Sequence, residues 1–258
     1  MSMGGGPVLS GLVLHIPHSS LVIPPGIRPA FALGPADLQQ EQLAMTDAYT
    51  DELFDIPEAT RIIFPVSRLV VDPERFLDDA QEVMAARGMG VVYTHTSRGE
   101  RLRPTPTAKE RTVLIERYYV PHHHAFTQAV DAVLAKRSTC LIIDCHSFPA
   151  IAHPYENVTD VERLDICLGT DDFHTPSWLV QAAMDAFEST GLRVAVNHPF
   201  SGTFVPNQHY RKEPRVQSLM IEVNRTKYMN EMTGDRLTCF WDIKALLNMV
   251  VTSVLVNE

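Results

Sequence analysis

Four short segments of the sequence carry side chains that can bind a metal ion or move a proton, and each one ends or follows an apolar run. The first covers residues 15–20, where Pro17 fixes the chain just ahead of His18. A histidine held in this way at the end of a strand is well placed to ligate a metal ion. A lone histidine is more often a hydrogen-bonded loop residue, so this segment needs support from others.

The second segment covers residues 142–147, in which Asp144 and His146 terminate a strongly apolar run. Burying such groups costs free energy unless they are paired or bind a metal ion. One interpretation makes His146 a metal ligand, with Asp144 nearby in a supporting role. The other is an Asp–His pair that only caps the strand. The residues alone leave both open.

The third segment covers residues 219–225, where Glu222 lies inside an apolar run. A carboxylate in such a place could act as the general base that activates water beside a metal ion. Simple strand alternation offers a second interpretation, because it places Met220, Glu222 and Asn224 together on one wet face.

The fourth segment covers residues 66–75, with Arg68 and Arg75 seven positions apart around an apolar centre. Arginine binds carboxylates through two parallel hydrogen bonds, although surface salt bridging is the commoner use. The histidine run 122–124 resembles a metal tract, but adjacent helical residues do not face one site, so at most one matters. Asp47 is a candidate oxygen ligand that could equally cap a helix.

An alternation of strand-like and helical patterns must position these segments, which predicts an α/β layered fold. We expect strands over residues 12–16, 61–66, 90–94, 140–145, 192–196 and 219–223. We expect helices over residues 110–136 with a candidate break at Pro121, over 175–190 with Thr175 as cap and Gly191 as stop, and over 245–256. The polar segments follow strands, which is where open α/β sheets place their active sites.

Composition excludes several classes of protein. The 258 residues are 45% hydrophobic and 21% charged, which is ordinary for a globular protein, and without a linker they predict a single domain over 1–258. A net charge of −9 argues against nucleic-acid binding. Four cysteines without CxxC spacing favour the cytoplasm. Residues 1–6 do not form a signal peptide, and residues 245–256 are too short and too polar to span a membrane.

No GxSxG, P-loop or GxGxxG motif occurs, which argues against a serine hydrolase, a nucleotide hydrolase or a dehydrogenase. In this order, however, the polar segments resemble the N-formylglutamate amidohydrolase family. Each piece is weak alone, but the ordered set is specific and spans residues 16 to 229. The pieces are Ile16-Pro17-His18-Ser19, Thr46-Asp47, Ser67-Arg68 through Asp72 and Arg75, Tyr118-Tyr119 with Pro121 and His123, Asp144-Cys145-His146-Ser147, Asp165-Ile166-Cys167-Leu168-Gly169, Asn197 with Pro199-Phe200 and Gly202, and Ile221-Glu222-Val223-Asn224-Arg225 with Tyr228-Met229.

The resemblance implies a mixed central sheet flanked by helices, as in the zinc-dependent exopeptidase (phosphorylase/hydrolase-like) fold. It implies hydrolysis of a small N-acyl amino acid, such as N-formylglutamate to formate and glutamate, as in one route of histidine degradation. It also implies one divalent metal ion per chain, taken to be zinc. His18 and His146 match the metal-binding positions, and we take Asp47 as the third ligand.

The resemblance also suggests roles for other residues. Glu222 falls where related zinc peptidases carry their catalytic glutamate, which takes a proton from water and passes it to the leaving amine. Arg75 would stabilise the oxyanion together with the metal ion. Arg68, Asn197 and Arg225 would contact the substrate.

This chain departs from the family pattern at two places. It has Asp72-Pro73-Glu74-Arg75 where the family usually shows Asp-Leu-Asn-Arg, and Phe148 where the family often has Met. Glu74 adds a negative charge beside the expected anion pocket, so we expect a substrate less acidic than N-formylglutamate.

Three alternatives remain open. A zinc carboxypeptidase or another N-acyl amino-acid deacylase would use the same site, and a non-catalytic metal- or ligand-binding protein could keep the fold. Glu222 discriminates against the last, because a pure binding module has no need of a base beside its metal. The sequence does not indicate the oligomeric state.

Overall fold

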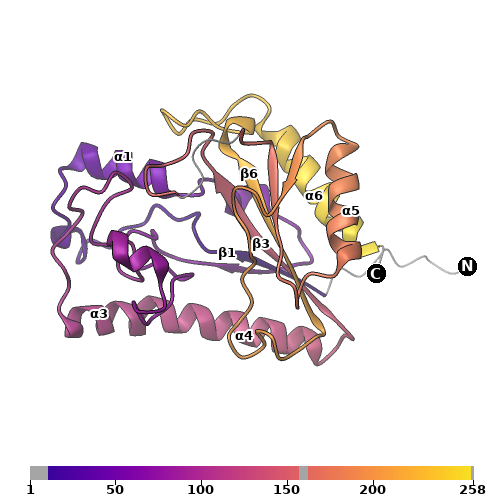
Figure 1. Ribbon diagram of the computed structural model, residues 1–258, viewed down its shortest axis with the longest axis horizontal. Coiled ribbons are helices and arrows are strands. Elements are labelled where there is room, and N and C mark those ends of the chain that lie inside the picture. Colours follow the sequence, from indigo (N-terminus) through magenta and orange to yellow (C-terminus); the bar gives the residue numbers. More distant parts are fainter. Residues whose placement is uncertain (1–10, 157–161, 257–258) are drawn as a thin grey trace, which may run out of the picture.

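The structure, a computed structural model, describes residues 11–156 and 162–256, so the expectation for residues 1–6 falls outside it. Its centre is a six-stranded sheet in the order β2-β1-β3-β6-β4-β5 (Figure 1). Adjacent strands are parallel except β4 and β6, which run antiparallel. The predicted mixed sheet is therefore confirmed. The strands are β1 (Leu12–Ile16), β2 (Thr60–Ile63), β3 (Cys140–Phe148), β4 (Ile166–Gly169), β5 (Val194–Val196) and β6 (Val216–Asn224).

Helices cover both faces of this sheet. Helices α5 and α6 pack against one face, and the long rod formed by α3 and α4 crosses the other (Figure 1). In the described ranges no helix combines the length and apolar character needed to cross a bilayer. The helices are α1 (Pro35–Met45), α2 (Thr50–Leu53), α3 (Ala108–Leu114), α4 (Val120–Leu134), α5 (Ser177–Glu188) and α6 (Phe240–Val256), with 3-10 turns at Arg28–Ala30, Val83–Arg87 and Arg225–Lys227.

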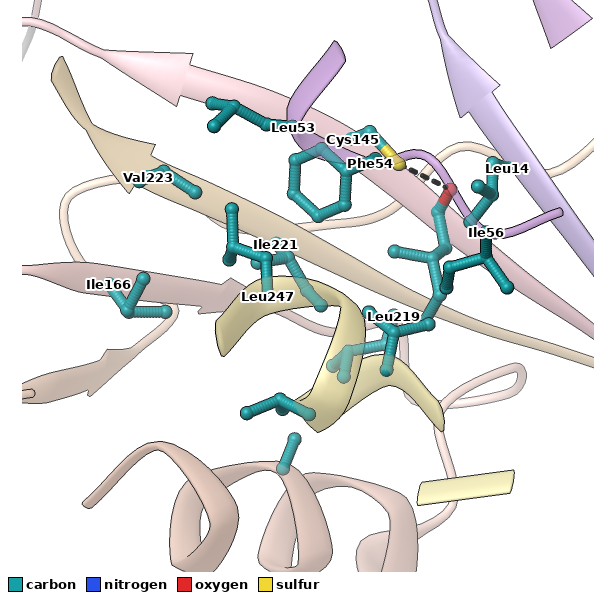
Figure 2. Close-up of a cluster of buried hydrophobic side chains, with 14 of the residues drawn as sticks. Leu14, Leu53, Phe54, Ile56, Cys145, Ile166, Leu219, Ile221, Val223 and Leu247 are labelled. Carbon is teal, nitrogen blue, oxygen red and sulfur yellow. Dashed lines mark hydrogen bonds between the residues drawn. The ribbon is translucent and has the colours of Figure 1, made fainter. Parts of the chain in front are cut away.

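Alternation along the three central strands separates an apolar face from a polar one. Leu14, Cys145, Leu219 and Ile221 point into the core beneath α6, where Leu247 meets them (Figure 2). Because successive strand residues point to opposite faces, the residues between them face the α4 side. Burying each large side chain of this core contributes roughly 1.5–3 kcal/mol.

The α4 side of the sheet changes character along the strands. Near the strand starts, Val13, Ile142 and Val216 pack with Phe126 and Val130 of α4. Toward the carboxyl ends, the same face carries the polar side chains of His15, Asp144, His146 and Glu222. The sheet therefore presents its chemistry at one edge, with an apolar support behind it.

The rod α3–α4 does not break at Pro121. A π-helical turn at Ile115–Tyr119 precedes the proline, and the backbone N–H of Val120 bonds to the carbonyl of Ile115 five residues back. A proline ring clashes with the carbonyl four residues before it in a regular α-helix. The wider turn removes that conflict, so the rod continues.

Two predicted local structures were wrong. Residues 90–94 form a loop rather than a strand; Val91, Val92 and Tyr93 are buried against residues 69–71 in a second apolar cluster. An apolar run signals burial in either conformation. Thr175 is not the cap of α5, because Pro176 occupies the cap position and the Thr175 hydroxyl donates to the Ser218 carbonyl.

Candidate metal centre and active site

A pocket of about 440 Å³ opens at the carboxyl ends of β1, β3 and β6. These strands are parallel neighbours, so the residues that follow them meet at one edge. Asn197 is the one residue of the predicted site outside the lining. The lining includes the other seven, which are His18, Asp47, Arg68, Arg75, His146, Glu222 and Arg225.

Two histidines and a carboxylate converge in this pocket. His18 lies two residues beyond β1, Asp47 lies between α1 and α2, and His146 lies on β3. One candidate ligand atom from each lies within 4.8 Å of the other two, and all three side chains are buried. Asp47 Oδ2 is 3.0 Å from His146 Nδ1 and 3.6 Å from His18 Nδ1.

The outer nitrogens of both rings are already bound to carboxylates. His18 Nε2 donates to Asp72 Oδ1 at 3.0 Å, and His146 Nε2 donates to Asp144 Oδ1 at 3.1 Å. In a neutral imidazole the other nitrogen then carries a lone pair, and both lone pairs face Asp47. Such acceptors need a proton or a cation between them. Metal-binding histidines are oriented by outer carboxylates in the same way.

The donor set fits a zinc-like ion. Among the described residues, His18 Nδ1 is buried without a hydrogen-bond partner, which is costly unless a ligand satisfies it. Bond lengths of roughly 2.0–2.1 Å in a tetrahedral centre put neighbouring ligand atoms about 3.3 Å apart. The separations of 3.0 and 3.6 Å from Asp47 to the two rings lie on either side of that value.

Neighbouring polar and charged side chains keep Asp47 ionised. Burial alone would raise its pKa, but the neighbouring rings of His146 and His18 and the charge of Arg225 hold the pKa well below the usual range. Arg225 donates to Asp47 Oδ1 at 2.9 Å and to the Ala44 carbonyl at 2.7 Å. We infer that Arg225 positions this ligand, since its guanidinium is already engaged.

Asp72 and Asp144 are held as firmly, by hydrogen bonds that join residues far apart in the chain. Asp72 accepts from the guanidinium of Arg68 at 2.8 and 3.1 Å and from the Tyr93 hydroxyl. Asp144 Oδ1 also accepts from His15 Nδ1 at 2.8 Å. The sequence analysis gave Asp144 a supporting role beside His146, but it named Asp72 only as part of the family resemblance.

Glu222 lies on the strand next to His146, one of the three candidate metal ligands. It is the register partner of His146, so both side chains point into the pocket. Its buried Oε2 has no hydrogen-bond partner within residues 11–156 and 162–256, and burial raises the pKa of Glu222 to about 8. Alternation does place Met220, Glu222 and Asn224 on one face, but that face is buried rather than wet.

Of the arginines, Arg75 is the most available to a ligand. Its ion pairs with Asp72 and Glu82 are both 3.7 Å, longer than a hydrogen bond, and in the part of the chain that the structure describes its Nε has no hydrogen-bond partner. Arg68, by contrast, is fixed on Asp72. Glu74 lines the pocket, with Oε1 3.3 Å from His146 Nε2.

The structure does not bring Asn197 into the pocket. It follows the edge strand β5, and its exposed side chain exchanges hydrogen bonds with Thr170. Its segment contributes through Pro199 to Phe204 instead, which line the pocket. In the histidine run, His122 contacts His15 and His123 bonds to the Pro73 carbonyl, while His124 is exposed.

The profile of the family described as N-formylglutamate amidohydrolase matches residues 10–229. The chain belongs to this family. A structure of N-formylglutamate amidohydrolase from Ralstonia eutropha JMP134 shares the family fold with a TM-score of 0.83 at 24% identity, over 96% of this chain and 93% of that one. A gene product of Agrobacterium tumefaciens superposes with a TM-score of 0.63 at 18% identity, over 97% of this chain and 93% of the other. No curated protein matches the sequence.

The buried pair of Arg225 and Asp47 gives a stability prediction. Arg225→Met should lower the free energy of unfolding by about 3–5 kcal/mol, because it leaves a buried carboxylate short of its partner. Urea denaturation with a chelator present measures this. Arg193→Gln, which breaks an exposed pair with Glu162, is the matched control and should change stability by less than about 1 kcal/mol. Equal effects would contradict the assigned role.

Proposed function

We propose that this chain is a single-domain, zinc-dependent hydrolase of the amide bond in a small N-acyl amino acid, in keeping with its amidohydrolase family. One observation carries the proposal. The buried His18 Nδ1, which has no hydrogen-bond partner among the described residues, lies with His146 and Asp47 in the pocket that Glu222 also lines. Metal ligands and a free base in one pocket are the requirements of metal-assisted hydrolysis.

His18, Asp47 and His146 would hold the ion. A zinc ion held by three protein ligands supplies Lewis acidity and can lower the pKa of water to about 7. Burial lowers the pKa of His146, but the charges of Glu74 and Asp144 outweigh it and raise the pKa overall. A proton must therefore leave His146 before the ring can bind an ion, so the affinity of the site for the metal would fall as the pH falls.

Glu222 would move the proton. An ideal acid–base catalyst has a pKa near the working pH, so that it can both accept and return a proton. Burial places the pKa of Glu222 at about 8, close to that condition. The carboxylate would take a proton from the attacking water and then give it to the amine that leaves.

Arg75 would bind the anionic part of the substrate or the developing oxyanion, because its guanidinium has donors to spare. The pocket volume of about 440 Å³ suits a small molecule. A zinc carboxypeptidase or another deacylase would use the same groups, and Glu74 at the pocket wall favours substrates with a less acidic side chain.

Metal content tests the ligands. The purified chain should carry close to one zinc ion, and His18→Ala or His146→Ala should remove most of it, because each removes a ligand. Elemental analysis by mass spectrometry measures the content. His124→Ala changes an exposed histidine and should keep the metal. Full occupancy in both ligand variants would refute the assignment.

Turnover tests the base. Glu222→Gln keeps the size of the side chain but cannot accept a proton, so kcat for N-acyl amino acids should fall about 10²–10⁴-fold. Metal content and KM should change little. Glu188→Gln, at the exposed end of α5, is the control. Unchanged turnover would remove Glu222 from the mechanism, and loss of metal would make it a ligand.

Substrate preference tests Glu74. Its charge should disfavour an acidic substrate side chain, so N-formylglutamate should be a poorer substrate than a neutral N-formyl amino acid. Glu74→Asn should raise the ratio of kcat/KM values toward N-formylglutamate. The ratio is compared over a panel of N-formyl amino acids. A ratio that stays constant in the variant would mean that Glu74 does not face the substrate side chain.

A further inference from the structure

A second cavity, here called the Arg103 cavity, shares no lining residue with the active-site pocket. It has a volume of about 600 Å³ and lies between the turn at residues 26–32, the segment 103–106 and the first turns of α3. Its walls are mainly apolar, with Ile27, Phe31, Val113 and Leu114 among them. Cavities of this size hold small organic molecules.

One wall of this cavity is a buried arginine without a counter-ion. Arg103 is 3% exposed, and its guanidinium stacks on the Phe31 ring at 4.4 Å from the centroid. Within the described ranges its guanidinium makes one hydrogen bond, to the Val70 carbonyl, which is long at 3.4 Å, and its Nε is without a partner. In the described part of the chain no aspartate or glutamate pairs with Arg103.

Such a charge is unusual, because buried charges are normally paired. Burial lowers the pKa of Arg103 to about 10, so the guanidinium still carries its charge at neutral pH. The stacking on Phe31 offsets part of the cost but supplies no acceptor. The free donors therefore call for an anion from outside the chain.

Two other charged groups, Lys109 and Glu110, line the cavity and offset each other, which leaves the charge of Arg103 uncompensated. Glu110 is engaged elsewhere, because its carboxylate accepts from the backbone and hydroxyl of Thr107 in the capping box of α3. Lys109 also lines the cavity, and among the described residues it forms no salt bridge. The cavity thus combines an apolar body with a net positive end.

We propose that the Arg103 cavity binds a small monocarboxylate with an apolar body. The carboxylate pairs with the guanidinium of Arg103, and the aliphatic or aromatic body packs against Ile27, Val113 and Leu114. A carboxylate accepts hydrogen bonds from a guanidinium, and its single negative charge matches the single uncompensated charge of Arg103. A cation would meet the uncompensated charge and be repelled.

Titration calorimetry and methyl NMR on the full chain test this site with two pairs of probes, 4-methylpentanoate and 3-phenylpropanoate with their primary amides. We expect saturable binding of the acids, at least about tenfold tighter than that of the amides, because the amide lacks the charge. Shifts should appear at Ile27, Val113 and Leu114. Equal binding of acid and amide, or shifts only around Glu222, would overturn the proposal.

Two variants separate the carboxylate contact from the apolar one. Arg103→Met keeps the stacking and should weaken acid binding at least about tenfold, while Arg75→Met in the active site should not. Val113→Trp fills the cavity from a half-exposed position and should block acids and amides alike. Full affinity in folded Arg103→Met contradicts the proposal. A dimer that is seen in sedimentation and that Val113→Trp dissociates would also contradict the proposal, because a second copy of the chain would then cover the cavity.

Discussion

The buried carboxylate of Asp144 joins the separate parts of the active site. Its Oδ1 accepts from His15 of β1 and from His146 of its own strand, and its Oδ2 accepts from the backbone N–H of Phe204 at 2.8 Å. An ionised group in this position would cost several kcal/mol without such partners. The bonds therefore fix the ring of His146 and the loop that closes the pocket together.

Asp72 plays the matching part for the second histidine. It holds the ring of His18 and is itself held by Arg68 and Tyr93. The loop that carries it depends on the apolar cluster of residues 69–71 and 91–93. Each ring thus has one nitrogen fixed on a buried carboxylate and the other turned toward Asp47. The two rings and the carboxylate of Asp47 are therefore preorganised around one point, as the proposed metal site requires.

The central strands could be predicted from the sequence because a continuous apolar run marks each of them. The runs of β1, β3 and β6 are continuous and apolar, so both the strands and the placement of His146 and Glu222 at their carboxyl ends could be predicted. Residues 90–94 were wrongly predicted as a strand, because an apolar run can also be buried in a loop. Register is invisible in a sequence, so the partnership of His15 with Asp144 could not be foreseen. Asn197 was misplaced because its strand lies at the sheet edge.

In the proposed site, His18 and His146 bind one ion through their Nδ1 atoms, together with Asp47. Their Nε2 atoms keep their hydrogen bonds to Asp72 and Asp144. Anomalous diffraction at the zinc absorption edge, from crystals of the zinc-loaded chain, tests it directly. We predict a single strong peak about 2.0–2.1 Å from both Nδ1 atoms and next to Asp47. A peak bonded to the Nε2 atoms beside Glu74, or no peak between these residues, would contradict it.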